Sequence, residues 1–149
     1  MIQIWEFSSQ GSLYDKQDAL RKENLEFMVL EYHQNGDLLS LLNKQMKFPE
    51  KVVWHWFRQI INLLKRMDEL QVYHRDIKPE NFLLDKDYNL VLTDFGSATN
   101  NLKSSKKVGT TIYMSPEVYK GMEYNSLLND IYSSAVIAFV LITGLVPQD

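Results

Sequence analysis

The sequence predicts an α+β protein that is mostly helical and carries a few short strands. Apolar side chains recur at i, i+3 and i+4 from Pro49 to about Leu70, which is the spacing of a long amphipathic helix. Residues 126–143 are almost uncharged and are predicted to form a second helix, buried on all sides. Short apolar runs bounded by turn signals indicate strands. The predicted strands are residues 2–7, 25–32, 82–84 and 90–92.

The amino-terminal part of the chain is predicted to contain two of these strands. Residues 8–24 between them are polar and mixed in charge, as in an exposed connection. Asn35-Gly36 is a strong turn signal, and Asp37 begins a short leucine-rich amphipathic segment. We therefore predict a strand-containing part at residues 1–32 and a mainly helical part at residues 33–149.

The predicted long helix begins at Pro49, which suits a first helical position. Residues 82–84 and 90–92, separated by a turn-like stretch, form one small hairpin, and residues 97–112 are a polar loop. The apolar run that ends at Val146 is shorter than the about 20 residues of a membrane-spanning helix. A buried core helix is therefore preferred over a transmembrane segment.

Composition narrows the classes of function. The 149 residues have the length of about one domain, with a net charge of −3 and no cysteine. The chain has no excess of positive charge that would favour nucleic acid as a partner. The absence of cysteine excludes disulfides and thiolate metal sites. The amino terminus has no basic segment followed by an apolar run, so no secretory signal is predicted. A cytoplasmic protein is expected, with the nucleus as the alternative and no membrane partner.

Two motifs lie close together in the middle of the chain. Residues 74–81 read H-R-D-I-K-P-E-N, and residues 92–96 read L-T-D-F-G. They place two carboxylates, a lysine and an asparagine on two loops joined by the short hairpin. Such a set can accept a proton from a hydroxyl, hold divalent metal ions and steady a phosphoryl group. The alternative is a pair of exposed polar loops, but eight ordered residues followed by D-F-G favour the chemical interpretation.

These motifs resemble the catalytic and metal-binding loops of eukaryotic protein kinases of the serine/threonine type. The resemblance implies a protein-kinase-like fold, mostly the helical C-lobe with two strands of a truncated N-lobe. It implies ATP-dependent phosphorylation of serine or threonine hydroxyls on protein substrates, with ATP and Mg²⁺ as cofactors. It makes Asp76 the catalytic base and Lys78 the contact to the γ-phosphate, with Asn81 and Asp94 as the magnesium ligands.

The same resemblance assigns structural roles around the two loops. His74 packs on Phe95, the phenylalanine of D-F-G, whose last residue is Gly96. Ile4 belongs to the same hydrophobic stack. Asp130 is the buried aspartate that hydrogen-bonds the backbone of the catalytic loop. A carboxylate at the head of a buried helix is costly unless it is satisfied, which supports that role.

The resemblance also implies a nucleotide pocket. The segment from Leu30 through Glu31 to His33 would meet adenine with its backbone, with Leu30 as the gatekeeper. Asp37 would meet the ribose hydroxyls, and Leu83 would pack beneath the adenine ring. The alternative is an ordinary strand and turn, which these residue types also suit.

The loop after D-F-G carries the implied contacts to protein substrate. Thr110 in G-T matches the threonine that contacts the catalytic aspartate and lysine, and Glu117 in M-S-P-E would pair with an arginine beyond Asp149. Arg75 implies a loop ordered by a phosphate, for which Ser104 or Ser105 could serve. The alternatives are a loop that needs no phosphate and a solvated basic patch.

Several parts of a complete kinase domain are not found in these residues. No G-x-G-x-x-G loop, V-A-I-K lysine or helix-C glutamate precedes Leu25. We therefore expect a partial domain of marginal stability that binds nucleotide weakly and phosphorylates little alone. The alternative function is a kinase-derived interaction or regulatory module without catalysis. A small-molecule phosphotransferase is less favoured, because the S-P-E segment belongs to kinases with protein substrates.

Overall fold

The chain divides into two units, Met1–Tyr32 and His33–Asp149, and the computed structural model describes residues 2–3, 27–28 and 30–147. In the first unit, β1 (Ile2–Gln3) pairs in parallel with β2 (Phe27–Met28). The strand predicted over residues 25–32 does not extend through residues 30–32, which have no regular structure. The predicted position of Ile4 lies outside the described residues.

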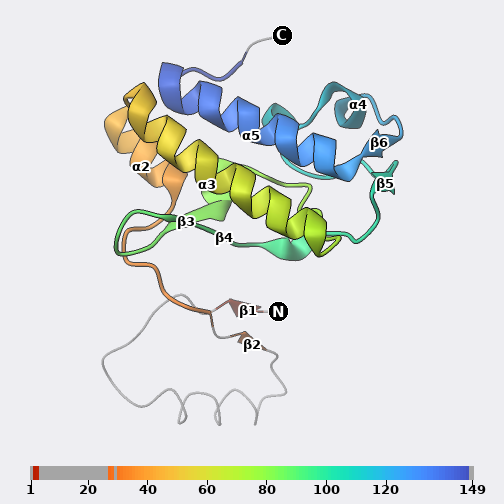
Figure 1. Cartoon of the computed structure of the whole chain (residues 1–149), viewed down its shortest axis with the longest axis horizontal. Coiled ribbons are helices and arrows are strands. Elements are labelled where there is room, and N and C mark those ends of the chain that lie inside the picture. The colour runs from red at the N-terminus through yellow and green to blue at the C-terminus, as the bar shows by residue number, and fades with distance from the viewer. Residues whose placement is uncertain (1, 4–26, 29, 148–149) are drawn as a thin grey trace. The chain divides into compact units, whose positions relative to one another are not determined.

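Two long helices lie side by side in the second unit (Figure 1). They are α3 (Glu50–Glu69) and α5 (Ser126–Thr143), and α2 (Leu38–Gln45) and the single turn α4 (Pro116–Tyr119) complete the helices of the described residues. The mostly helical α+β fold is confirmed. Pro49 lies one residue before the predicted position, because its extended ψ of 141° makes it the N-cap of α3.

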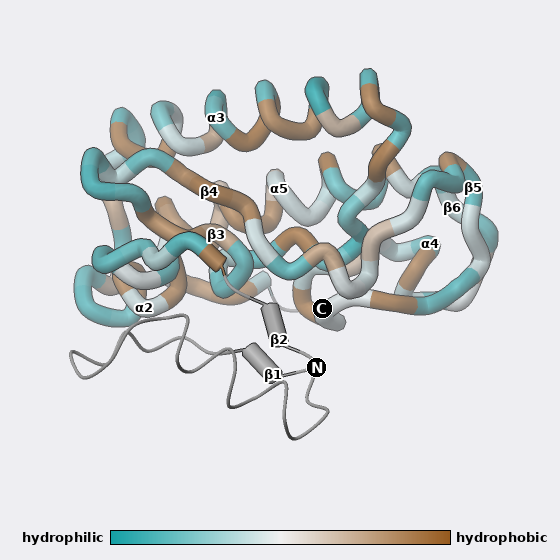
Figure 2. The backbone as a smooth tube through the Cα atoms, turned by 90° about the horizontal axis from the view of Figure 1, so that it is seen from below, coloured by the Kyte–Doolittle hydropathy of each residue, from teal (hydrophilic) through white to brown (hydrophobic). Residues whose placement is uncertain are grey.

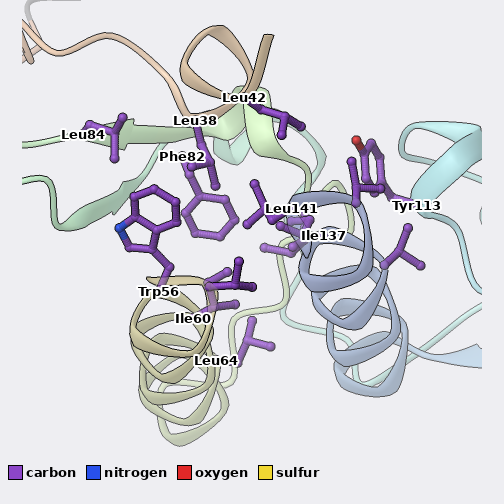
Figure 3. Close-up of a cluster of buried hydrophobic side chains, with 14 of the residues drawn as sticks. Leu38, Leu42, Trp56, Ile60, Leu64, Phe82, Leu84, Tyr113, Ile137 and Leu141 are labelled. Atoms are coloured by element: carbon purple, nitrogen blue, oxygen red, sulfur yellow. The ribbon is translucent and has the colours of Figure 1, made fainter. Parts of the chain in front are cut away.

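Apolar side chains between α3 and α5 form the core of this unit. Every three to four residues α3 turns a side chain inward, including Trp56, Ile60 and Leu64, to pack in a cluster with Ile137 and Leu141 of α5 (Figure 3). The tube of α3 accordingly alternates between hydrophilic and hydrophobic colours along its turns (Figure 2). Burial of these side chains supplies the main driving force for the packing of the two helices.

A small hairpin places the two sequence motifs next to one another. Strands β3 (Phe82–Leu84) and β4 (Leu90–Leu92) are antiparallel, have the predicted bounds and pair Phe82 with Leu92. The Phe82 side chain is fully buried in the core, which fixes the strand that follows the first motif. The Trp56 indole N–H donates to the Tyr88 carbonyl at 2.9 Å and ties the hairpin turn to α3.

The prediction that α5 is buried on all sides is wrong. One face is buried, but the opposite face exposes an uncharged apolar stripe to solvent. The stripe consists of Leu128, Ile131, Tyr132, Phe139 and Ile142. By length and by its mean hydropathy of 1.6, α5 would be long and apolar enough to cross a membrane, but half of it is buried inside the protein. Half-burial against protein agrees with a core helix, as does the buried aspartate at its amino-terminal end.

The predicted polar loop at residues 97–112 also differs from the structure. It contains the strand β5 (Lys103–Ser104), which pairs antiparallel with β6 (Tyr124–Asn125). Short 3₁₀ turns at Phe95–Ser97 and Thr111–Tyr113 overlap its two ends. A two-residue strand gives no readable alternation, so only the pairing with a distant segment reveals it. Figure 1 shows β5, β6 and α4 at the same end of the unit.

Candidate active site

The first motif is attached to α5 through Asp130. The two carboxylate oxygens accept hydrogen bonds from the backbone N–H groups of His74 and Arg75, both at 2.7 Å. Burial raises the pKa of Asp130 to about 7, although these two donors and the charge of Arg75 act to lower it. The hydrogen bonds expected from Asp130 are present, and they fix the start of the first motif on the helix.

Three side chains converge at the centre of the site. The Asp76 carboxylate accepts a hydrogen bond from the Lys78 amino group at 2.7 Å on one oxygen and from the Thr110 hydroxyl at 2.8 Å on the other. Lys78 also donates to the Thr110 hydroxyl at 3.0 Å, which closes a triangle. Burial alone would raise the pKa of Asp76, but the hydrogen bonds from Lys78 and Thr110 hold it below 3.8. Asp76 is therefore ionised at neutral pH.

Asn81 and Asp94 carry the oxygen atoms best suited to a metal ion. The Asn81 amide N–H donates to the Asp76 carbonyl at 2.9 Å, and its side-chain oxygen accepts no hydrogen bond within residues 30–147. The Asn81 carbonyl accepts from the N–H of Thr93, directly before Asp94, whose backbone is left-handed with φ of 62°. Carboxylate and amide oxygens are ligands that Mg²⁺ accepts, so the donor set fits this ion. Within residues 30–147 no group of three acidic, histidine or cysteine side chains offers another metal site.

His74 uses both ring nitrogens to hold the two motifs together. Its Nε2 lies 3.0 Å from the Thr93 carbonyl, and its Nδ1 accepts from the N–H of Asp76 at 3.3 Å. These contacts require a neutral ring with the proton on Nε2. Burial lowers the pKa of His74 below 6.5, which favours the neutral form. The expected contact with Phe95 is present as an edge-to-face pair with ring centroids 5.0 Å apart.

This arrangement makes part of the stability depend on pH. Because the pKa of His74 is lower in the folded than in the unfolded protein, the unfolded state takes up the proton first as the pH falls through 6.5. The stabilisation is therefore complete above pH 6.5 and lost below it. Asp130, whose pKa is raised, acts in the opposite direction between pH 7 and pH 5, so His74 is isolated by comparing two proteins. We expect the unfolding free energy of His74→Phe, measured by urea unfolding, to shift towards higher stability from pH 7 to pH 5 relative to the wild-type protein. The same pH dependence in both proteins would contradict a neutral His74.

The residues predicted to bind nucleotide fall in both units. Leu30, which is 40% exposed, and Glu31 belong to the first unit, and His33, Asp37 and Leu83 belong to the second. Within the second unit, Asp37 and Leu83 form an isolated β-bridge, so they lie side by side. The Asp37 carboxylate also caps α2 by accepting from the N–H and hydroxyl of Ser40 at 2.8 and 2.7 Å. Capping gives Asp37 a structural role, and its contact with ribose stays a prediction.

The guanidinium of Arg75 is buried and bound to the loop that follows the second motif. Its Nε donates to the Ser97 carbonyl at 2.8 Å, and one terminal nitrogen donates to the Ser104 hydroxyl at 3.3 Å. Ser105 is exposed and makes no such contact in the described part of the chain.

Two further predicted residues have less specific surroundings. Glu117 is exposed in α4, and no ion pair is found for it within residues 30–147. Gly96 donates its N–H to the Asp94 carboxylate at 3.3 Å.

Sequence reasoning missed two polar side chains of α5 that hold the S-P-E segment. The Asn129 amide oxygen accepts from the N–H of Ser115 at 3.1 Å, and the Ser133 hydroxyl donates to the Tyr113 carbonyl at 2.6 Å. Both side chains are buried. Their signal was present, because a buried polar residue in an apolar helix needs a partner.

Comparisons with known proteins identify a family profile and several relatives that match this chain. A family profile described as "Protein kinase domain" matches residues 2–149. The probable serine/threonine-protein kinase KCC4 of Saccharomyces cerevisiae is 34% identical over 99% of this chain and 15% of its own length. The serine/threonine-protein kinase GIN4 of the same yeast is 39% identical over 83% of this chain and 11% of its own length. The carbon catabolite-derepressing protein kinase of Secale cereale is 40% identical over 83% of this chain and 25% of its own length.

The chain therefore spans a quarter or less of the length of these three relatives. Within that span, the profile covers both motifs, the S-P-E segment and the helix that anchors them. The chain belongs to the protein kinase domain family.

Proposed function

We propose that this chain carries the phosphoryl-transfer centre of a serine/threonine kinase that uses ATP and Mg²⁺ to phosphorylate protein hydroxyls. The triangle of Asp76, Lys78 and Thr110 is the observation that carries this proposal. It joins a carboxylate and a cation on one loop to a hydroxyl on the segment before S-P-E. A substrate hydroxyl next to Asp76 would therefore lie beside the Lys78 ammonium.

Asp76 would act mainly by orientation. Phosphoryl transfer requires alignment and charge stabilisation more than covalent chemistry from the protein. The lowered pKa of Asp76 makes its carboxylate a weak base, so it would hold the substrate hydroxyl in line and receive its proton late in the reaction. Each carboxylate oxygen already accepts one hydrogen bond and retains a lone pair for that hydroxyl.

The other charged and polar groups of the site would stabilise the transferred group. Lys78 lies 2.7 Å from Asp76 and would neutralise negative charge on the γ-phosphate. The Asn81 and Asp94 oxygens would hold Mg²⁺, which neutralises phosphate charge when it is bound. Asn81 is oriented for this task by its bond to the Asp76 carbonyl.

The metal proposal is tested in the full-length protein that contains these residues. We expect Asp94→Ala to weaken nucleotide binding in the presence of Mg²⁺ and to leave the weaker binding without Mg²⁺ unchanged, as measured by calorimetry. The matched control is Asp87→Ala, at an exposed aspartate of the hairpin turn. An equal loss of affinity with and without Mg²⁺ would remove Asp94 from the metal site.

We also propose that residues 1–149 form only part of a kinase domain. No glycine-rich phosphate loop or V-A-I-K lysine occurs in the sequence, so ATP would lack the groups that cover its phosphates. We expect the isolated chain to turn over well below the ~1 s⁻¹ at the low end for kinases. This absence favours an interaction or regulatory module as the second candidate for the isolated chain. A turnover of ~1 s⁻¹ or more in a radiolabelled-phosphate assay would contradict both statements.

A further inference from the structure

A cluster of lysines surrounds the segment that leads to Thr110. Residues 101–123 contain four lysines and two glutamates, whereas the whole chain has a net charge of −3. All four lysines are exposed. We name this cluster the basic patch; its members are Lys103, Lys106, Lys107 and Lys120.

A strand pair and hydrogen bonds connect the two stretches of chain that carry the basic patch, residues 103–107 and 119–125. Strand β5, which contains Lys103, pairs with β6, and the Tyr124 hydroxyl donates to the Lys106 carbonyl at 2.9 Å. The Lys107 amino group donates to the Tyr119 carbonyl at 2.7 Å and lies 4.7 Å from the centre of its ring. Tyr119 directly precedes Lys120. The lysines are therefore presented together by a bonded scaffold.

Most of the positive charge of the basic patch remains available. Lys103 lies 3.6 Å from Glu123, a surface pair in which both side chains are largely exposed and which contributes little. The Lys107 ammonium has three N–H donors and uses one of them in the hydrogen bond to the Tyr119 carbonyl. No ion pair involves Lys106 or Lys120 within residues 30–147. The remaining acidic residue of the segment, Glu117, is exposed in α4.

The basic patch also lies close to the centre of the site along the chain. Lys107 is three residues before Thr110, whose hydroxyl contacts Asp76. Three residues of chain span at most about 11 Å, so Lys107 lies no farther than that from Thr110. A bound extended peptide covers the same distance with about three of its own residues. A peptide that places its hydroxyl at Asp76 would thus bring residues within about three positions of that hydroxyl to Lys107 and its neighbour Lys106.

We propose that the basic patch selects acidic protein segments, with aspartate, glutamate or phosphorylated residues within about three positions of the acceptor hydroxyl. This inference rests on the proposed function, because it places the acceptor at Asp76. A peptide is favoured over nucleic acid or an anionic membrane because the patch is small, adjoins the catalytic centre and belongs to a chain of negative net charge.

Binding of fluorescent nine-residue peptides to the chain tests the proposal without requiring catalysis. All three peptides carry a central serine. One has aspartates at the three positions after the serine, and another has aspartates at the three positions before it. The third has asparagines at all six of these positions. We expect one aspartate peptide to bind about tenfold more tightly than the asparagine peptide at low salt, and the gain to shrink at high salt. Equal affinities of all three peptides would overturn the proposal.

Charge-reversal variants locate the binding surface. Lys106→Glu should remove most of the gain, and the Lys106 side chain makes no hydrogen bond or ion pair within residues 30–147 whose loss would unfold the loop. Lys107→Glu should do the same but also breaks the bond to Tyr119, so Lys106→Glu is the decisive variant. Lys65→Glu, on the exposed side of α3, is the control and should leave the gain intact. An unchanged gain in Lys106→Glu would overturn the proposal, as would binding of RNA or anionic vesicles in place of the peptides.

The same peptides separate this inference from the proposed function. In the full-length protein with ATP and Mg²⁺, the better-binding aspartate peptide should be phosphorylated with a lower KM than the asparagine peptide. Tight binding without any transfer to the central serine would overturn the proposed function and leave the basic patch as a peptide-binding surface. Transfer to both peptides with the same KM would overturn the basic patch and leave the function.

Discussion

Asp76→Asn is expected to reduce phosphoryl transfer by about 10²–10⁴-fold in the full-length protein, the range for loss of a positioned general base. Asparagine has nearly the same size but only one acceptor oxygen, so it loses either the bond from Lys78 or the bond from Thr110. It also loses the negative charge that orients the substrate hydroxyl. Nucleotide affinity should stay nearly unchanged, because Asp76 is not one of the predicted nucleotide or metal ligands.

Steady-state kinetics and nucleotide titrations measure the two quantities separately. Asp87→Asn makes the same chemical change on the exposed hairpin turn and should alter neither. A variant at Asp76 that transfers phosphate as fast as the wild-type protein would remove Asp76 from the mechanism. A large loss of nucleotide affinity would instead show that Asp76 acts through the nucleotide pocket.

Gly109→Ala is expected to destabilise the chain by at least about 2 kcal/mol, given the cost of a strained backbone position and an added steric clash. Gly109 has a φ of 108°, and an added Cβ would lie 2.5 Å from the carbonyl oxygen of Arg75 and 3.6 Å from the Asp76 carboxylate. The contact at Arg75 is with backbone, which cannot rotate away as a side chain can. The catalytic loop and the segment before Thr110 must then separate, so transfer should fall as well.

Gly121→Ala separates the clash from the backbone strain. Gly121 also has a positive φ, of 70°, but an added Cβ would meet nothing within 4 Å. Its replacement should cost only about 1–2 kcal/mol, the penalty for a left-handed residue, and leave transfer unchanged. Equilibrium urea unfolding measures both variants. Equal losses of stability would show that the close approach of Gly109 to Arg75 is unimportant.

The sequence predicted best those elements whose signal is local. The periodicity from Pro49 onward predicted α3 to within a residue at each end, and the hairpin strands have the predicted bounds. A helix of this length repeats its pattern several times, so single exceptions do not obscure it. The two motifs also led directly to the side chains that the structure gathers around Asp76.

Features that depend on distant partners were not predicted. The strand β5 gains its structure from β6, about twenty residues later, and the exposed stripe of α5 depends on which neighbours the helix meets. Hydropathy reports how apolar a helix is, but not which of its faces is covered. The contacts of Asn129 and Ser133 were missed for a related reason, since the donor to Asn129 and the acceptor for Ser133 lie in a segment whose path the sequence does not reveal.

Asn129, Asp130 and Ser133 lie on two successive turns of α5 and set the spacing of the two segments around Asp76. Asp130 sets the position of the H-R-D backbone, while Asn129 and Ser133 set that of the S-P-E segment. The separation between Asp76 and Thr110 therefore depends on the fixed positions of these anchors on one rigid helix and not on the loops themselves. Both loops can change sequence between these anchor points and keep their spacing. A one-residue insertion between Asp130 and Ser133, by contrast, would rotate Ser133 by about 100° relative to Asp130 and break its bond to the Tyr113 carbonyl.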